Sequence, residues 1–165
     1  MPITKEEFEA ASERDLSKLA QEALNLLEEV GAKLGFRSDR NYPHAAGDLD
    51  LVWYLEIDLP GLELHRLPIV GFEIETSWRT RKHIKGDLFN LQKLHPALGI
   101  VILLEEGFED EKKFRGLLQT TNRYARDEGF ILVWTEEQLE KLKAIVESTK
   151  KSSPTNSVRA LTGGN

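Results

Sequence analysis

The apolar positions of this chain follow two different periods, and the period distinguishes its strands from its helices. Between residues 48 and 57 every second residue is apolar, including Leu49, Leu51 and Trp53, with Asp50 among the alternate residues. This period of two predicts a strand, with Leu49, Leu51 and Trp53 on one face and Asp50 on the other. Residues 99–104 and 130–134 are continuously apolar, which predicts strands covered on both faces.

The helical period dominates four other stretches. The first helix is expected from Thr4 to about Val30, with a capping box at its start and with Gly31 and Gly35 marking its end. Further helices are expected over about residues 80–94 and 110–127. A second capping box, Thr135-Glu-Glu-Gln138, predicts a last helix that ends near Ser148.

Two shorter strands complete the predicted order. One spans residues 36–42 and ends before Pro43, and the other spans residues 69–75 after Pro68. The order is α-β-β-β-α-β-α-β-α, in which the first strands can form an antiparallel meander and the later ones should run parallel. We therefore predict an α/β sandwich around a mixed central sheet, with one domain over residues 1–149 and a disordered tail over residues 150–165.

Composition limits the class of protein. Of the 165 residues, 40% are hydrophobic and 30% charged, which is typical of a soluble globular domain. The absence of cysteine excludes disulfides and thiolate metal sites and favours the cytoplasm, and the apolar runs are too short to cross a membrane. The net charge of −6 disfavours a protein that coats nucleic acid without specificity, although it leaves room for a local basic face.

Carboxylates interrupt two of the predicted strands. Asp50 lies in one strand, and Glu73 and Glu75 share one face of the other. If these strands pair antiparallel, the start of the first, including Asp48, approaches the end of the second. Converging buried carboxylates repel one another unless a cation lies between them, so the pattern predicts a site for a hard divalent metal such as Mg²⁺. Phosphodiester hydrolysis is the chemistry that such a site favours.

A basic segment follows directly after these acids. Arg79, Arg81, Lys82 and Lys85 stand in residues 77–85, which contain no acid. The start of the predicted helix also favours phosphate through its free N–H groups. We predict that Arg79, Arg81 and Lys82 contact the backbone of DNA.

The two acidic stretches together resemble a known nuclease superfamily. Gly-Asp-Leu-Asp-Leu-Val at residues 47–52 and Gly-Phe-Glu-Ile-Glu-Thr-Ser-Trp at residues 71–78 are similar to the core of the PD-(D/E)XK superfamily, and closest in pattern to its archaeal Holliday-junction resolvases. The resemblance covers about residues 12–105 and implies a restriction-endonuclease-like fold. It also implies that Asp50 and Glu73 bind Mg²⁺, with Mn²⁺ as a substitute, and that the protein forms a homodimer.

Residue 75 departs from the superfamily pattern, which usually has lysine there. The resemblance implies that Glu75 is a third metal ligand or orients the attacking water. A lysine on the next helix, Lys85 in preference to Lys82, would then stabilise the developing negative charge. Gln92 would contact the phosphate or hold the water.

Two functions of different classes follow from this pattern. The first is a Mg²⁺-dependent DNA endonuclease with Asp50, Glu73, Glu75, Lys85 and Gln92 as catalytic residues. The alternative is a nuclease-fold module that has lost catalysis and binds DNA or a protein partner. A structural ion site without a nucleic-acid role is a third reading. An acid from the first helix could also join the site, and Glu22 is the best candidate.

Overall fold

The computed structural model describes the backbone of residues 5–44, 47–61, 65–76, 81–105 and 110–152, and their side chains except those of 5–17, 43–44, 47, 81–83 and 151–152. The secondary-structure elements follow in the order α1 (Lys5–Lys33), β1 (Arg37–His44), β2 (Gly47–Ile57), β3 (His65–Glu75), α2 (Arg81–Leu94), β4 (Leu98–Leu103), α3 (Glu111–Glu128), β5 (Ile131–Thr135) and α4 (Glu136–Ser152). No helix in these ranges is long and apolar enough to span a membrane.

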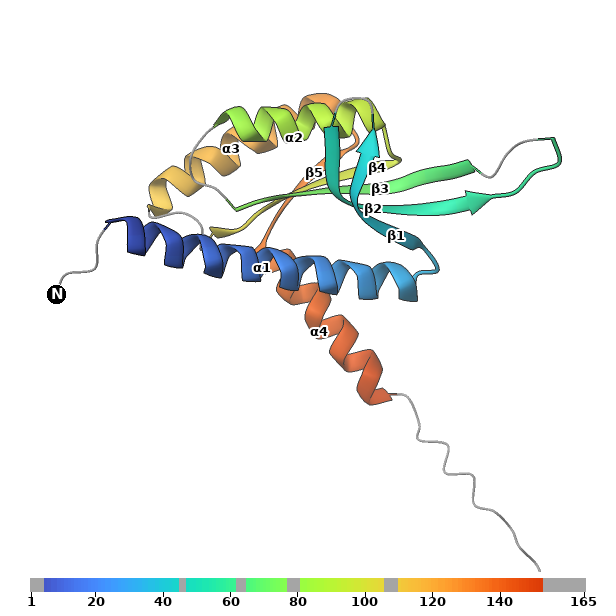
Figure 1. The fold of residues 1–165 in the computed structure, drawn as a ribbon, viewed down its shortest axis with the longest axis horizontal. Coiled ribbons are helices and arrows are strands. Elements are labelled where there is room, and N and C mark those ends of the chain that lie inside the picture. The colour runs from blue at the N-terminus through green and yellow to red at the C-terminus, as the bar shows by residue number, and fades with distance from the viewer. Residues whose placement is uncertain (1–4, 45–46, 62–64, 77–80, 106–109, 153–165) are drawn as a thin grey trace, which may run out of the picture.

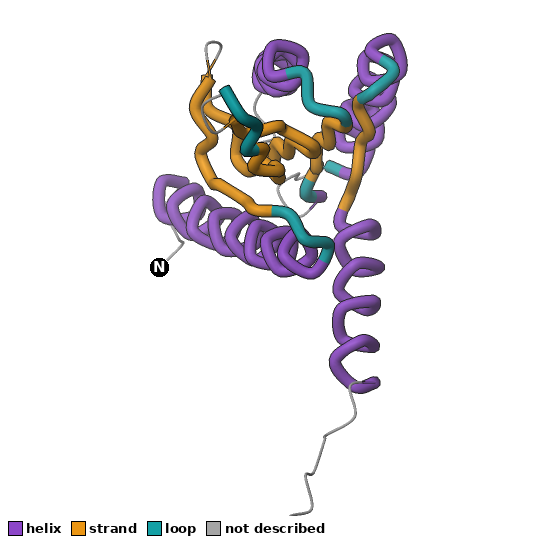
Figure 2. Tube along the Cα trace, turned by 90° about the vertical axis from the view of Figure 1, so that its right-hand side faces the viewer, coloured by secondary structure: helices purple, strands orange, loops and turns teal. Residues whose placement is uncertain are grey.

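A five-stranded mixed sheet forms the centre of the molecule. Its strands lie in the order β1-β2-β3-β4-β5. The β1–β2 and β2–β3 pairs are antiparallel, whereas β3–β4 and β4–β5 are parallel. Helices α2 and α3 cover one face, and α1 with the start of α4 covers the other (Figures 1 and 2). The prediction of an α/β protein with a mixed sheet between helices is therefore confirmed.

Each face of the sheet has its own hydrophobic core. Leu51 and Trp53 of β2 pack with α1 residues such as Leu27, whereas Val52 and Tyr54 pack with α2 and α3. The predicted alternation therefore holds from residue 51 to 54. It was wrong for Leu49, which lies in the same core as Val52. Leu49 and Leu51 lie on opposite faces because β2 changes its side-chain orientation at Asp50, beside Asn41 of β1, whose φ is +49°.

Four predicted element ends also differ from the structure. Strand β3 begins at His65 instead of after Pro68, which lies at the register shift opposite Tyr54. Helix α1 continues through Gly31 to Lys33, because the missing side chain leaves space for Trp53. Strand β1 includes Pro43, which is tolerated because β1 is an edge strand of the sheet. Helix α4 runs to Ser152 instead of ending near Ser148, and the rest of the tail predicted for residues 150–165 lies outside the described residues. The Thr135–Gln138 cap is confirmed, because the Thr135 N–H donates to Gln138 Oε1 at 2.7 Å.

Gly31 permits a close contact between helix α1 and Trp53 of strand β2. A Cβ at Gly31 would lie 2.6 Å from Trp53 Nε1, and the indole is held by stacking on Phe36 and by an edge contact with Phe72. We expect Gly31→Ala to lower the free energy of unfolding by about 1–3 kcal/mol, measured by urea denaturation. Gly116→Ala is the matched control, because it lies in α3 with no atom within 4 Å of the added methyl and should stabilise by about 0.5–1 kcal/mol. Equal effects of the two substitutions would contradict this account.

Candidate functional site

The candidate site lies where β2 and β3 separate. The last paired residues on this side are Leu51 and Phe72. Beyond this pair, backbone N–H groups donate to side chains of the opposite strand instead of to its backbone. The Ile74 N–H donates to Asp50 Oδ2 at 2.7 Å, and the Asp50 N–H donates to Glu73 Oε2 at 3.3 Å. The structure thus brings Asp50 and Glu73 together, as the antiparallel pairing predicted. Each carboxylate is held by the backbone of the opposite strand.

Helix α2 supplies the third side of the site. Asn90 Nδ2 donates to Glu73 Oε1 at 3.0 Å, so the Glu73 carboxylate bridges β2 and α2. Asp87 lies one turn earlier on the same side of α2 and is half-buried. Neither Asp87 nor Asn90 was among the residues predicted for the site. Their spacing along α2 could have identified them, because both border the buried stripe of Ile84, Leu88 and Leu91.

The carboxyl groups of this cluster resist ionisation. Only 4% of Glu73 is exposed, and burial together with repulsion from Asp50 and Asp87 raises the pKa of Glu73 to about 9. Burial, and then the charges of Glu75 and Asp50, raises the pKa of Asp87 to about 8. Burial also raises the pKa of Asp50, against the opposing effect of hydrogen bonds with Ile74 and Glu73. In the described part of the chain no Lys or Arg forms an ion pair with Asp50, Glu73 or Asp87.

Glu75 belongs to the same neighbourhood. It is buried at 7% exposure, two residues after Glu73 in β3. Repulsion between the carboxylates of Glu75 and Asp87 helps to raise the pKa of Asp87. The described acids of the site therefore come from three elements: Asp50 from β2, Glu73 and Glu75 from β3, and Asp87 from α2.

The other predicted residues lie on α2 or outside the described residues. Lys85 is exposed and Gln92 is half-buried on α2, whereas Asn90 is the α2 residue bonded to Glu73. Arg79 lies outside the described residues. Arg81 and Lys82 form the first turn of α2, but their side chains are not among those described.

The two remaining acidic candidates do not join the cluster. Asp48 is exposed at the start of β2. Glu22 lines a groove between α1 and α4, on the opposite face of the sheet from α2, so it does not contribute to the carboxylate cluster. The suggestion that Glu22 completes the site was therefore wrong, because this side of α1 faces α4.

The donor set suits a hard divalent cation that keeps much of its water. No three His, Asp or Glu side chains within the described ranges are arranged to hold a metal ion by themselves. Mg²⁺ is commonly bound through one or two carboxylates, with water and substrate phosphate in the remaining positions. Asp50 and Glu73 supply two adjacent carboxylates for such a site: the Asp50 N–H donates to Glu73, which is buried, and Asp50 itself is half-buried.

Comparison of the chain with models of protein families, with curated proteins and with solved structures finds no match.

Proposed function

We propose that this protein is a metal-dependent DNA endonuclease that hydrolyses phosphodiester bonds at the Asp50–Glu73 site. The observation that carries the proposal is the buried carboxylate cluster. Glu73 and Asp87 have pKa values raised to about 9 and about 8, and no described Lys or Arg is paired with them. Proteins that bury several acids in contact usually use them, since structure alone favours apolar residues or salt bridges there.

The resemblance to PD-(D/E)XK nucleases supports the same reaction. Asp50 and Glu73, which would hold Mg²⁺, are the two acids that the hydrogen bonds of β2 and β3 join. When bound, the metal would lower the pKa of a water nucleophile and neutralise charge on the phosphate. Glu75 would orient that water, and Asn90 would hold the Glu73 carboxylate in place.

The basic residues would act on the DNA rather than on the acids. Arg79, Arg81 and Lys82 immediately precede or open α2, where free N–H groups also favour phosphate. Lys85 is exposed on the next turn and can reach a bound strand. Gln92 remains a candidate contact to the phosphate.

A catalytically inactive DNA-binding or protein-binding module is the second candidate. It is favoured by residue 75, where the superfamily has lysine and this chain has a buried glutamate. Asp87 on α2 adds a further carboxyl group to the site, and not the missing cation. Such a module would keep the carboxylate cluster without turning over substrate.

The two candidates are separated by incubating the protein with plasmid, single-stranded and branched DNA. We expect strand cleavage with Mg²⁺ or Mn²⁺ and none with EDTA, because the carboxylates require a cation to approach phosphate. Products are measured on denaturing gels. Binding is measured with the same DNA by fluorescence anisotropy.

Intact DNA under every condition, with tight binding retained, would reject the endonuclease and support the inactive module. Arg81→Ala with Lys82→Ala should weaken binding of DNA of any sequence and reduce its salt dependence. Unchanged affinity for DNA in that double variant would show that Arg81 and Lys82 do not contact DNA. A matched control is Lys112→Ala with Lys113→Ala, which removes two exposed lysines from the start of α3.

A further inference from the structure

Helices α1 and α4 enclose a groove on the face of the sheet opposite to the carboxylate cluster. Its volume is about 550 Å³. Its apolar lining comes from α1, from the residue after β4 and from α4, and consists of Leu19, Ala23, Leu26, Leu104, Leu139 and Val146. Leu19 and Leu26 are half-buried, and the other four apolar residues are buried at the floor of the groove.

The spacing of the floor residues matches a helical ligand. Leu19, Ala23 and Leu26 recur along α1 at intervals of four and three residues, and Leu139 and Val146 lie two turns apart on α4. Leu104, only 1% exposed, lies at the base. Two helices with facing apolar stripes form the kind of groove into which a third amphipathic helix packs.

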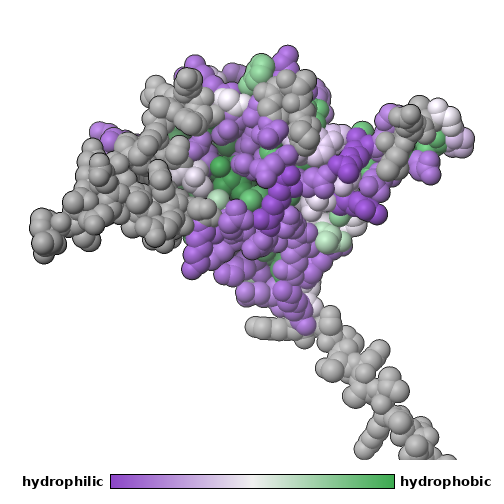
Figure 3. Space-filling view, viewed as in Figure 1, coloured by the Kyte–Doolittle hydropathy of each residue, from purple (hydrophilic) through white to green (hydrophobic). Residues whose placement is uncertain are grey.

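The rim of the groove is strongly acidic. Five glutamates line it, against the two lysines Lys143 and Lys150. The glutamates come from both helices and are Glu22, Glu29, Glu136, Glu140 and Glu147. Lys150 Nζ lies 2.9 Å from Glu29 Oε1, and this ion pair leaves four glutamates against Lys143. The surface seen in Figure 3 is likewise mostly hydrophilic, with a small apolar area exposed among polar residues.

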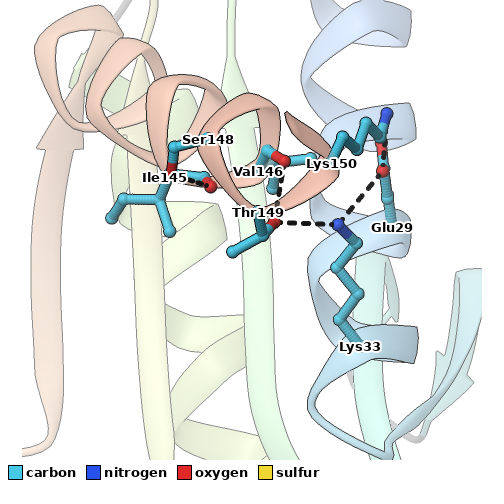
Figure 4. A network of polar contacts seen from close by, with 7 residues as sticks. All are labelled: Glu29, Lys33, Ile145, Val146, Ser148, Thr149 and Lys150. Carbon is cyan, nitrogen blue, oxygen red and sulfur yellow. Dashed lines mark hydrogen bonds and ion pairs between the residues drawn. The ribbon is translucent and has the colours of Figure 1, made fainter. Parts of the chain in front are cut away.

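Polar contacts join the two helices at the C-terminal end of α4 (Figure 4). Lys33 Nζ donates to Thr149 Oγ1 at 3.3 Å and lies 3.7 Å from Glu29 Oε1. Together with the Lys150–Glu29 ion pair, these contacts tie the last turns of α4 to the end of α1. These contacts involve Thr149 and Lys150, which lie beyond the predicted helix end at Ser148, and they help to hold the last turn of α4 against α1.

We propose that this groove binds a cationic amphipathic helix of a partner protein. An apolar floor with an acidic rim is complementary to a helix that carries one leucine-rich stripe between lysines or arginines. DNA is disfavoured because the rim would repel phosphate. A second copy of the chain is disfavoured because its rim would bring like charges together. The carboxylate cluster lies on the other face of the sheet, so this inference is independent of the proposed nuclease activity.

The test uses the full chain and a fluorescent peptide of about 18 residues, built from leucine and lysine at helical spacing. A second peptide has the same composition in an order that breaks the apolar stripe. We expect the amphipathic peptide to bind at least about tenfold more tightly than the scrambled one, measured by anisotropy, because only it presents leucines to the floor together. Affinity should also fall as salt rises.

Charge reversal locates the binding site. Glu140→Lys with Glu147→Lys, both exposed on α4, should weaken peptide binding at least about tenfold. The control is Asp58→Lys with Asp127→Lys, which makes the same change of charge at exposed positions outside the groove and should change affinity about threefold at most. Circular dichroism verifies that both variants fold.

Four outcomes would overturn the proposal. Equal binding of the two peptides, or equal loss in the two double variants, would show attraction to net charge alone. Concentration-dependent dimers, seen by sedimentation and abolished by Glu140→Lys with Glu147→Lys, would assign the groove to a second copy. Tighter peptide binding after Arg159→Glu would assign it to the chain's own C-terminal residues.

Discussion

Glu73→Gln is expected to make the metal-free protein more stable at alkaline pH, by about 2–4 kcal/mol at pH 9. Glu73 is buried beside Asp50 and Asp87, and its pKa is raised to about 9 from an ordinary value near 4.5. Glutamine has the shape of the protonated carboxyl and never ionises. It can accept from the Asp50 N–H and, if the Asn90 amide turns over, donate to Asn90 in return.

The sign of the effect follows from proton binding in the two states. Below about pH 4.5 Glu73 is protonated in both the folded and the unfolded chain, so it adds no pH dependence. Between about pH 4.5 and 9 the unfolded chain has lost this proton while the folded chain retains it, and the stability of the wild-type protein therefore falls as pH rises. Asp87, with a pKa raised to about 8, acts in the same direction. The variant lacks the Glu73 contribution, so its advantage should grow with pH.

Urea denaturation in EDTA at pH 5, 7 and 9 measures this advantage. Glu147→Gln is the matched control, because Glu147 is exposed on α4 and the same substitution there should change stability by less than about 0.5 kcal/mol. A Glu73→Gln protein no more stable than wild type at pH 9 would show that the cluster is not strained by charge.

The arrangement of elements could be predicted because its signals are local. The alternating residues around Trp53 and the apolar runs at 99–104 and 130–134 indicate strands by themselves, and the Thr135–Gln138 cap marks the start of α4. The errors arose where a distant residue decides the local structure. Gly31 remains inside α1 because of Trp53, and the last residues of α4 bond to α1.

The residues of the site could be predicted only where the pairing of two strands brings them together. Asp50 and Glu73 are 23 residues apart, and an antiparallel hairpin brings them together whatever its loop contains. The α2 residues could not be identified in this way, because the rotation of α2 is set by packing of Ile84, Leu88 and Leu91 against the sheet. That rotation turns Asp87 and Asn90 toward Glu73, whereas Lys85 is left exposed.

Asp50→Asn is expected to weaken metal binding and to lower DNA cleavage strongly while leaving the fold intact. Asparagine can still accept the hydrogen bond from the Ile74 N–H through its side-chain oxygen, so the link between β2 and β3 persists. What is lost is one of the two negative charges that would hold Mg²⁺. We expect Mn²⁺ affinity, measured by calorimetry, to fall at least about tenfold, and cleavage to fall about 10³-fold.

Asp58→Asn provides the control, because it is the same substitution at an exposed residue just after β2 and should leave both measurements unchanged. In the wild-type protein, Mn²⁺ should bind more tightly as pH rises toward 9, since the cation must displace the proton that Glu73 retains. DNA cleavage by the Asp50→Asn variant at the wild-type rate would show that this cluster does not catalyse the reaction. Glu73→Gln should lose cleavage as Asp50→Asn does while gaining stability, and this opposite response is what distinguishes a functional carboxylate from one that only supports the fold.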